Sequence, residues 1–423
     1  MTSTLTQRPK WQLTCEWLAI SAITACFFVT YLSVSLTTVA YLAAFILILV
    51  SANWRLRFAS ISSNLPALSF WALTALFVIG AFYTTSTSAL MKHDLCTNIW
   101  LLITPFFIMV IKDDNWRQRM INAFLSIMII TVAVSFLKRF FHIDPFASIH
   151  FIKIPYQKND FIFDHIKQSY AMNIAAFICA YRILFENKYK IFYGILFILM
   201  AIDIVFVSHG RTGYGVFFVL LVYLSLIRFG WRGTLLTAVL SVLIMSVAFF
   251  ASPAFHERVK RIVTDTVHYH HMRQLHQTTS VGQRIEMLQI SKMMIEKRPW
   301  FGYGTGGIRT AMPAVVPLKD RSLLLTPTID SVESIYLNFW LKFGLFGLII
   351  FLLTVVVQIK ASFRLPVTYR HLIQAVLIAT LFGGFFCSYF QSFQIKHLYA
   401  LFFALCFSAL NTHENNNCLQ SQR

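Results

Sequence analysis

The sequence predicts an all-α, polytopic membrane protein. Of its 423 residues, 57% are hydrophobic and only 13% are charged, whereas soluble domains carry about 25% charged residues. The apolar residues come in long unbroken runs, which favour spanning helices over the alternating strands of a transmembrane β-barrel. The 42 Phe and 9 Trp residues suit lipid-facing and interfacial positions. This composition excludes a soluble enzyme, a disordered chain and a collagen-like fibre.

Twelve apolar runs are candidates for membrane-spanning helices, because a spanning helix needs about 20 apolar residues. They lie at 13–33, 36–53, 65–85, 97–112, 119–137, 168–186, 190–208, 213–229, 233–252, 333–358, 369–389 and 394–411. The first run is too long for the apolar region of a signal peptide, and no clear cleavage site follows it. We therefore expect it to span the membrane.

The charges between these runs predict the orientation of the chain, because Lys and Arg accumulate on the cytoplasmic side. Arg8 and Lys10 precede the first run, and every second connection after it is basic. These connections carry Arg55, Arg57, Lys112, Arg117, Arg119, Lys188, Lys190, Arg228, Arg232, Lys360, Arg364 and Arg370. All of them face the cytoplasm if twelve helices are counted from a cytoplasmic N-terminus. Residues 412–423 then form a cytoplasmic tail.

The remaining chain divides into three parts. Residues 1–252 are expected to form transmembrane helices 1–9, and residues 333–411 to form helices 10–12. Between them, residues 253–332 are expected to form a large helical loop on the external face. This loop is rich in Lys, Arg and His, although long loops are translocated largely regardless of their charge. The charge indicates an anionic ligand, with a solvated helical hairpin near anionic headgroups as the alternative.

Within this loop, residues 281–297 predict an amphipathic helix that ends before Pro299, because the residue preceding a proline is pushed out of helical geometry. Its apolar stripe contains Ile285, Leu288 and Ile295. The glycines of residues 299–307 are expected to form a flexible turn. No Lys-Ser/Thr pair follows them, so this segment is not a phosphate-binding P-loop.

Two arginines are candidates for binding an anion. Arg211 lies in Ser-His-Gly-Arg-Thr-Gly after the seventh run, and its fixed fork of donors matches phosphate oxygens. The flanking Gly210 and Gly213 permit close backbone approach. Arg284, near the start of the loop helix, could add a second guanidinium to the same site. The alternatives are an interfacial anchor for Arg211 and an exposed surface arginine for Arg284.

Two carboxylates and three basic residues are further candidates. Asp330 and Glu333 lie where the loop returns to the tenth run, where a carboxylate could act as a general base toward a sugar hydroxyl. Such a carboxylate could instead pair with a neighbouring arginine or with a helix N-terminus. His165, at the start of the sixth helix, and Lys396 and His397, at the start of the last, are either polar contacts or residues of a substrate groove.

Four segments together resemble the O-antigen ligase superfamily, which also includes O-antigen polymerases and some protein O-oligosaccharyltransferases. They are Arg-Thr-Gly-Tyr (211–214), Gly-Gln-Arg (282–284), Arg-Pro-Trp-Phe-Gly-Tyr-Gly-Thr-Gly (298–306) and Tyr-Leu-Asn-Phe-Trp-Leu-Lys-Phe-Gly-Leu-Phe-Gly-Leu (336–348). The resemblance extends over about residues 160–400, and its specificity lies in the order, spacing and common membrane face of the motifs.

The resemblance implies a GT-C-type glycosyltransferase in the bacterial inner membrane, with its active site on the periplasmic face. Its donor would be a glycan on undecaprenyl diphosphate and its acceptor a sugar of lipid A-core, with no cofactor and no nucleic acid. The family's two diphosphate-binding arginines correspond to Arg211 and Arg284. No metal is implied, and the seven cysteines show no spacing typical of a metal site or a disulfide framework.

The position of Glu333 bears on which reaction is expected. Ligases usually carry a catalytic His at the return of the loop, whereas this chain has Glu333-Ser334-Ile335 and polymerase-like members have an Asp. The segment 388–401, with a His before the last apolar helix, is more similar to ligases. We therefore expect an O-antigen ligase in which Glu333 is the base of an inverting transfer, with an O-antigen polymerase as the alternative. A transporter or flippase is a third reading, although no internal repeat is seen.

Overall fold

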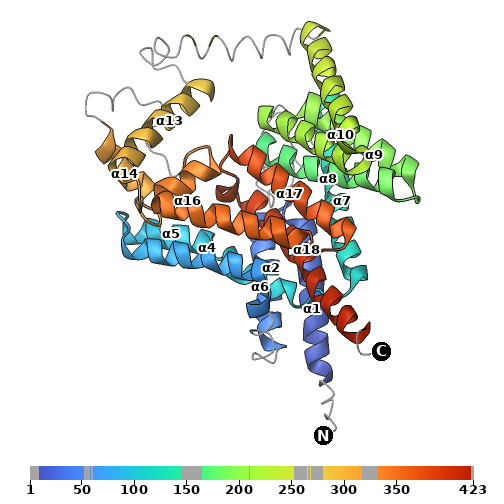
Figure 1. Cartoon of the computed structure of the whole chain (residues 1–423), viewed down its shortest axis with the longest axis horizontal. Helices are drawn as coiled ribbons and strands as arrows, with labels where there is room; N and C mark the ends of the chain where they lie inside the picture. The colour runs from blue at the N-terminus through green and yellow to red at the C-terminus, as the bar shows by residue number, and fades with distance from the viewer. Residues whose placement is uncertain are drawn as a thin grey trace.

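The computed structural model describes residues 9–51, 58, 61–143, 164–208, 210–251, 264, 267, 280–316 and 331–420. These parts of the chain are helical and are joined by short turns (Figure 1). The elements are α1 (Lys10–Val29), α2 (Val34–Val50), α4 (Leu65–Phe82), α5 (Ser88–Thr97), α6 (Trp100–Ile108), α7 (Asp114–Phe136), η1 (Leu137–Phe141), α8 (His165–Phe185), α9 (Lys190–Ile202), η2 (Asp203–Val207), α10 (Arg211–Ala251), α13 (Ser280–Lys297), α14 (Ile308–Val315), α16 (Ile335–Ser362), α17 (Val367–Gly384), η3 (Tyr389–Gln391) and α18 (Phe393–Gln420).

Seven of the described helical segments are long and apolar enough to cross a membrane, which confirms an all-helical, multi-pass membrane protein. They are Lys10–Val29, Leu65–Phe82, Asp114–Phe141, Lys190–Val207, Arg211–Leu235, Ile335–Ser362 and Phe393–Leu410. The count of twelve spans is not confirmed. The fourth predicted run forms only the nine residues of α6, which measure about 14 Å at 1.5 Å per residue, less than half of a hydrocarbon core of about 30 Å.

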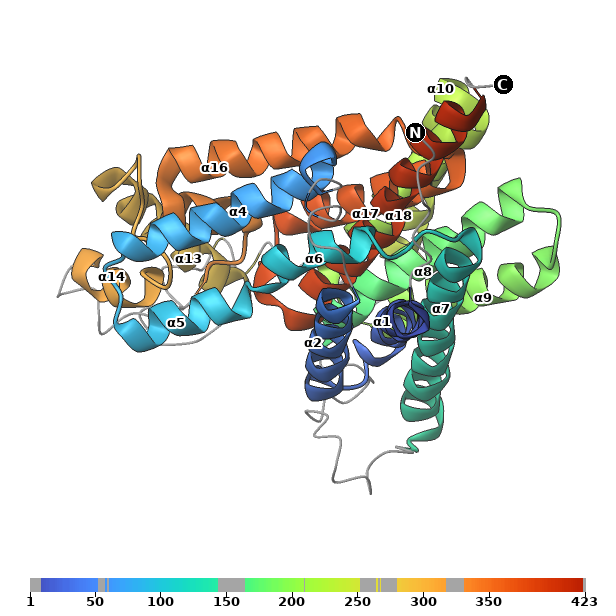
Figure 2. The same ribbon diagram turned by 90° about the horizontal axis from the view of Figure 1, so that it is seen from below.

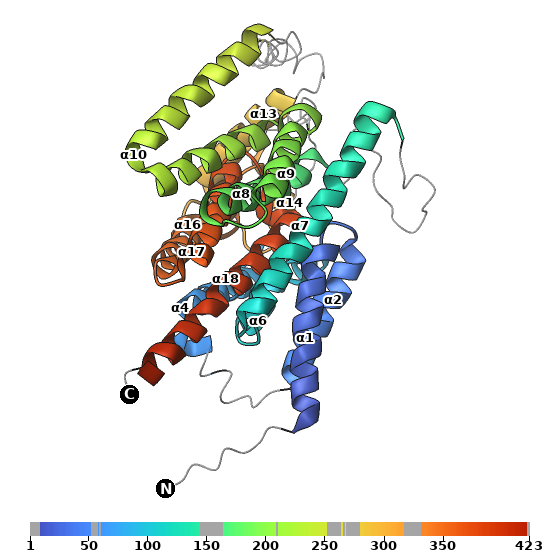
Figure 3. The same ribbon diagram turned by 90° about the vertical axis from the view of Figure 1, so that its right-hand side faces the viewer.

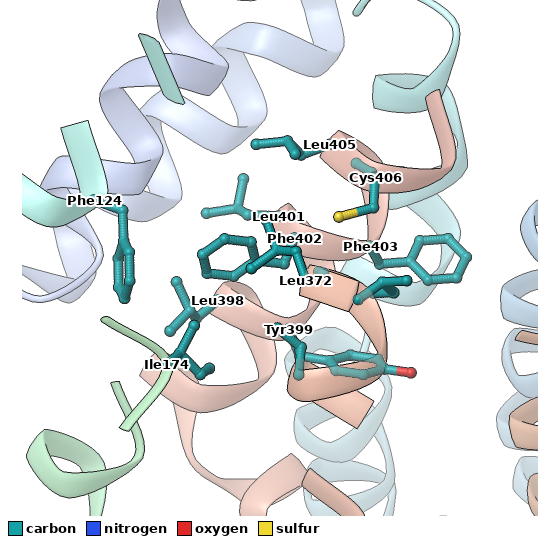
Figure 4. Close-up of a cluster of buried hydrophobic side chains, with 14 of the residues drawn as sticks. Phe124, Ile174, Leu372, Leu398, Tyr399, Leu401, Phe402, Phe403, Leu405 and Cys406 are labelled. Carbon is teal, nitrogen blue, oxygen red and sulfur yellow. The ribbon is translucent and has the colours of Figure 1, made fainter. Parts of the chain in front are cut away.

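Helix α18 forms the centre of the bundle. Of its spanning window, Phe393–Leu410, 89% is buried inside the protein, as expected for a helix that is apolar on every face. Its Leu398, Phe402 and Cys406 lie in one apolar cluster with Phe124 of α7 and Ile174 of α8 (Figure 4). This central packing holds the N-terminal and C-terminal halves of the chain together.

The other helices pack around α18 in neighbouring pairs. Helix α1 packs against α2 and α7, and α8 packs against α9 and α10. Helices α4 and α16 lie side by side (Figure 2). Helix α13 lies toward the end of the molecule opposite to the start of α1 and the end of α18 (Figures 1 and 3). This places α13 at the far end from the predicted cytoplasmic ends of the chain.

Helix α13 confirms the predicted helix at 281–297, which ends before Pro299, whereas its amphipathic character is not confirmed, because Glu286 is buried. The packed face differs from the predicted stripe, because Leu288 is 57% exposed. Ile290 and Met294 are buried instead, against Tyr303 and residues of α14. Ile290 and Met294 are four positions apart and therefore lie on the same face of the helix. This is the face that packs against the neighbouring segment.

The segment 299–307, here called the glycine-rich loop, is not the flexible turn that we expected from its sequence. Helix α16 is broken at Gly344, whose φ is +67°, and the glycine-rich loop fills the break. Backbone N–H groups of Tyr303 and Gly304 donate to the carbonyls of Leu341 and Lys342 at 2.9 and 2.7 Å. Leu345 N–H donates to the carbonyl of Pro299 at 2.8 Å.

The reason for this order is the cost of unpaired backbone groups in an apolar environment. Thr305 N–H also donates to the carbonyl of Gly80 in α4, at 3.1 Å, so the loop joins α4 to α16. At Gly344 a Cβ would lie 2.0 Å from the backbone of Trp300, which excludes any larger residue. These glycines therefore allow close backbone packing between the loop and the broken helix.

Candidate functional site

An ion pair joins the loop helix to the segment that leads into α16. Arg284 Nε of α13 donates a hydrogen bond to Glu333 Oε2 at 2.6 Å. The two side chains are 31% and 39% exposed, so solvent or a ligand reaches both of them. The sequence leaves open whether Glu333 pairs with a neighbouring arginine. In the structure it does, and the partner is Arg284. The pairing uses only one nitrogen of the guanidinium.

Glu333 is held in place by the first turn of α16. The Asn338 amide accepts from Val332 N–H at 3.1 Å and donates to the Val332 carbonyl at 2.6 Å. Ser334 is the N-cap of α16, with its side chain accepting from Leu337 N–H. Both residues flanking Glu333 are therefore anchored, and its carboxylate projects from a fixed backbone.

Arg211 is the first residue of α10, and its side chain is exposed. Within the described ranges it makes no hydrogen bond or ion pair, which leaves its donors available to an anion. The π-helical turn η2 lies just before it, and π-helical turns are frequent at functional sites. There Gln168 Nε2 donates to both carboxylate oxygens of Asp203 at 3.3 and 3.1 Å.

Cys387, in the turn between α17 and η3, connects these candidates. Its Sγ lies 3.5 Å from Thr212 Oγ1, the residue after Arg211. Burial raises the pKa of the Cys387 thiol, the Thr212 hydrogen bond and the charge of Arg284 lower it, and the charge of Glu333 raises it. Cys387 therefore touches the start of α10, and the charges of Arg284 and Glu333 act on its thiol in opposite directions.

His165 lies beside the same region. It is the first residue of α8, whose N-cap, Asp164, accepts from Ile166 and Lys167 N–H at 2.9 Å. A Cβ at Gly210 would lie 3.4 Å from His165 Cδ2. A Cβ at Gly213 would lie 2.7 Å from Ser169 Cβ, so this glycine allows α10 to pack against α8 rather than a ligand to approach.

The other predicted site residues lie elsewhere. His397 is 7% exposed, and its ring stacks on Phe393 at 4.0 Å and meets Tyr41 edge-on at 5.2 Å. Lys396 is 3% exposed and donates to the carbonyl of Thr97. Both are packed side chains rather than part of an open groove. Asp330 lies outside the described residues.

A buried ion pair was missed in the sequence. Lys342 Nζ lies 2.8 and 2.7 Å from the two carboxylate oxygens of Asp94, which also accepts from Gly306 N–H at 2.8 Å and from Asn98 Nδ2 at 3.2 Å. The pair joins α5, the glycine-rich loop and α16. A lysine inside an apolar run is costly without a partner. The position of Lys342 in such a run is therefore a sequence signal for a buried ion pair, but it does not identify Asp94 as the partner.

No metal centre is formed by the described residues, among which no group of three His, Cys, Asp or Glu side chains could hold a metal ion. The guanidinium groups of Arg211 and Arg284 are suited to binding an anion, and the carboxylate of Glu333 is suited to accepting a proton. Electrostatic stabilisation of a leaving diphosphate and deprotonation of a hydroxyl are the two operations that this arrangement can perform.

Two comparisons with known proteins find similarity over part of the chain. An uncharacterized protein of Haemophilus influenzae is 24% identical over 294 residues, which cover 66% of this chain and 69% of that protein. Residues 195–352 match the family model described as O-antigen ligase. The matched segment contains Arg211, Arg284 and Glu333, together with the glycine-rich loop. Over this segment, the chain is similar to the O-antigen ligase family.

Proposed function

We propose that this protein is an O-antigen ligase. It transfers a glycan from undecaprenyl diphosphate to a sugar hydroxyl of lipid A-core, without a metal and with inversion at the anomeric carbon. The observation that carries the proposal is the Arg284–Glu333 ion pair, which holds a guanidinium and a carboxylate together. With the exposed Arg211 at the start of α10, two guanidinium groups and one carboxylate lie within the segment that matches the family.

Arg284 is suited to act on both the base and the leaving group. Its Nε is bonded to Glu333, and no described residue accepts a hydrogen bond from its two terminal nitrogens. A guanidinium has five donors in a fixed fork, so these nitrogens remain for phosphate oxygens. Arg211, exposed at the start of α10, provides the second set of donors.

The chemistry follows from these positions. The bond between the anomeric carbon and the diphosphate oxygen breaks, and the electron pair leaves with the diphosphate. Arg211 and Arg284 stabilise the charge that grows there, because their guanidinium donors bond to the diphosphate oxygens. The acceptor oxygen attacks from the opposite face, which inverts the anomeric configuration, and its proton passes to Glu333.

The proposed topology places this site outside the cytoplasm. We propose a multi-pass protein of the bacterial inner membrane, with a periplasmic loop over residues 253–332 and a cytoplasmic tail over residues 412–423. The basic connections on one face support this orientation. The position of α13 at the end opposite to the start of α1 and the end of α18 is consistent with it.

An O-antigen polymerase is the second candidate, favoured by the carboxylate at position 333, where ligases usually have a His. It would join repeats linked to undecaprenyl diphosphate by the same chemistry. Loss of a ligase leaves polymer on the lipid carrier, whereas loss of a polymerase leaves single repeats on the core. The lipopolysaccharide of a deletion strain therefore distinguishes the two. A transporter or flippase would transfer no glycan in either case.

The proposal is tested by transfer in vitro with purified protein, undecaprenyl-diphosphate glycan and lipid A-core. We expect glycosylated lipid A-core as product, unchanged yield with a chelator, and no product with Arg211→Ala or Arg284→Ala. Lys292→Ala is the matched control, because Lys292 lies on α13 with 79% of its side chain exposed. Absence of transfer by the wild-type protein, or full activity of both arginine variants, would contradict the proposal.

A further inference from the structure

Three large aromatic side chains form an exposed surface at the break in α16. Trp300 and Phe301 belong to the glycine-rich loop, and Phe346 is the second residue after Gly344. Their exposed fractions are 56%, 64% and 49%. The centroid of the Phe346 ring lies 6.0 Å from that of Trp300 and 5.3 Å from that of Phe301. The three rings therefore form one continuous surface, here called the aromatic patch.

The backbone beneath the aromatic patch is held by hydrogen bonds. Leu345 N–H and Trp340 Nε1 both donate to the carbonyl of Pro299, at 2.8 and 3.1 Å. Phe346 N–H donates to the carbonyl of Trp300 at 3.5 Å. Large aromatic side chains gain free energy when they leave water, and an exposed apolar patch marks a contact with another protein or with a membrane. The fixed exposure of these rings therefore calls for a partner.

The lengths of two helices place the aromatic patch at one edge of the apolar layer. Like the 18 residues of α4, residues 345–362 of α16 measure about 27 Å at 1.5 Å per residue. This length is close to a hydrocarbon core of about 30 Å. Helix α4 contains no charged residue, and the first charged residue after the break in α16 is Lys360. Each segment can therefore cross the hydrocarbon by itself.

These two segments cover the same depth, because α4 and α16 lie side by side in opposite directions (Figure 2). At one end, Gln358 Nε2 of α16 donates to Ser69 Oγ of α4 at 3.4 Å. At the other end, a Cβ at Gly80 would lie 2.5 Å from the ring of Phe343. The glycine-rich loop bonds to both helices at this second end. The aromatic patch therefore lies where both apolar segments stop.

The aromatic patch also continues the exposed apolar face of α16. Phe346, Ile349, Leu353 and Val356 are spaced by three or four residues and so lie on one face of the helix. Their exposed fractions are 49%, 44%, 57% and 43%. An exposed apolar face on a membrane-spanning segment meets lipid, and aromatic residues are enriched where the hydrocarbon meets the headgroups. The patch occupies that boundary at the end of the lipid-facing surface.

We propose that the aromatic patch is seated in the phospholipid bilayer, at the membrane–water interface on the side of α13. Helix α13 ends at Lys297, just before the loop, and Tyr303 of the loop donates from its hydroxyl to the carbonyl of Met294 at 2.9 Å. A loop anchored in the bilayer therefore fixes the C-terminal end of the helix that carries Arg284. This inference goes beyond the proposed transferase function and does not depend on it.

Quenching of tryptophan emission by lipid tests the contact. The full chain is reconstituted in vesicles of phosphatidylethanolamine and phosphatidylglycerol whose acyl chains carry bromine near the carboxyl or the methyl end. The emission of Trp300 is the difference between the wild type and Trp300→Phe, which keeps a ring in the patch. We expect this emission to lose most of its intensity, more so with bromine near the carboxyl end.

The matched control for quenching is Trp100, which is 1% exposed. Its emission, measured through Trp100→Phe, should be nearly the same in brominated and ordinary vesicles. If the emission of Trp300 were as insensitive to brominated lipid as that of Trp100, the proposal would be overturned. Stronger quenching by bromine near the methyl end would place Trp300 in the middle of the bilayer and would also overturn it.

A spin label distinguishes lipid from other occupants of the aromatic patch. Phe301→Cys is labelled in vesicles, in a protein whose own cysteines are replaced by alanine. Lys292→Cys on α13 is the matched control, because 79% of the Lys292 side chain is exposed. We expect the label at position 301 to collide more with oxygen, which concentrates in hydrocarbon, than with a water-soluble nickel chelate. The label at position 292 should show the reverse.

Two results of this measurement would contradict the lipid contact. Equal access of the nickel chelate to positions 301 and 292 would mean that the patch lies in water. Spin–spin broadening between labels at position 301 that persists at high dilution in lipid would mean that a second copy of this chain covers the patch. Oxygen access at position 301 without such broadening supports the bilayer as the partner.

Discussion

Arg284 Nε of α13 and Glu333 Oε2 lie 2.6 Å apart, and this ion pair connects residues that are 49 positions apart in the sequence. The contact holds the carboxylate beside the guanidinium through Nε, so the terminal nitrogens of Arg284 can donate to another anion. It also gives the carboxylate a cationic partner before any substrate binds. The proposed base and one of the proposed diphosphate ligands therefore act as a unit.

The first prediction concerns Glu333. Glu333→Gln keeps the shape of the side chain and its contact with Arg284 but cannot take a proton from the acceptor hydroxyl. We expect kcat to fall by about a hundredfold to ten-thousandfold, with little change in KM for the donor. Glu333→Asp should retain part of the activity. Transfer by Glu333→Gln at the wild-type rate would remove Glu333 from the mechanism.

The second prediction concerns the coupling within this pair. Arg284→Ala and Glu333→Gln each disturb both groups, so the double variant should be about as impaired as the worse single variant. A double-mutant cycle on kcat measures this coupling. Additive effects on the activation free energy would show that Arg284 and Glu333 act independently and would contradict the shared role.

The third prediction concerns the pH dependence of Cys387. Because burial raises the pKa of this thiol, thiolate forms only at a pH above the ordinary range for cysteine, and alkylation should stay slow at neutral pH and rise late. The measurement is the alkylation rate against pH in proteins with Cys387 as the single cysteine. The exposed Cys96 of α5, alone in the matched protein, should react faster. Rapid modification of Cys387 at neutral pH would contradict its burial.

The fourth prediction concerns the Asp94–Lys342 pair. Asp94→Asn leaves the ammonium group of Lys342 buried without its counter-charge, which should destabilise the protein by about 3–5 kcal/mol. Asp94→Asn combined with Lys342→Met should recover much of this loss, because the unpaired charge is then removed. Thermal unfolding in detergent measures both effects. If the single variant were as stable as the wild type, the pair would have no structural role.

The fifth prediction concerns the break in α16. Gly344→Ala places a Cβ 2.0 Å from Trp300 at a φ of +67°, so we expect a large loss of thermal stability. Gly194→Ala in α9 is the matched control, because nothing lies within 4 Å of its Cβ position. This control should be stabilised by up to about 1 kcal/mol. Equal stability of the two variants would mean that the glycine-rich loop does not need its close contact with α16.

The sequence predicted those features that depend on local pattern. Apolar runs located the long helices, and Pro299 located the end of α13, because both follow from residues close together in the chain. Arg211 and Arg284 are predicted from the sequence because each guanidinium carries its anion-binding chemistry by itself. The matched family segment contains both of them.

Features that depend on distant contacts were not predicted. Asp94 and Lys342 are 248 positions apart, and no local pattern indicates their pairing. The glycine-rich loop was interpreted as flexible because its glycines permit many conformations, whereas its backbone partners lie in α4 and α16. The proximity of Cys387 to Thr212, 175 positions earlier, likewise follows only from the packing of α17 against α10.

The central claim is that Arg211 and Arg284 bind one diphosphate, and equilibrium binding of undecaprenyl diphosphate without a glycan tests it most directly. We predict that Arg211→Ala and Arg284→Ala each weaken binding at least about tenfold, that the double variant abolishes it, and that Lys292→Ala binds as the wild type does. Wild-type affinity in either single arginine variant would contradict the account.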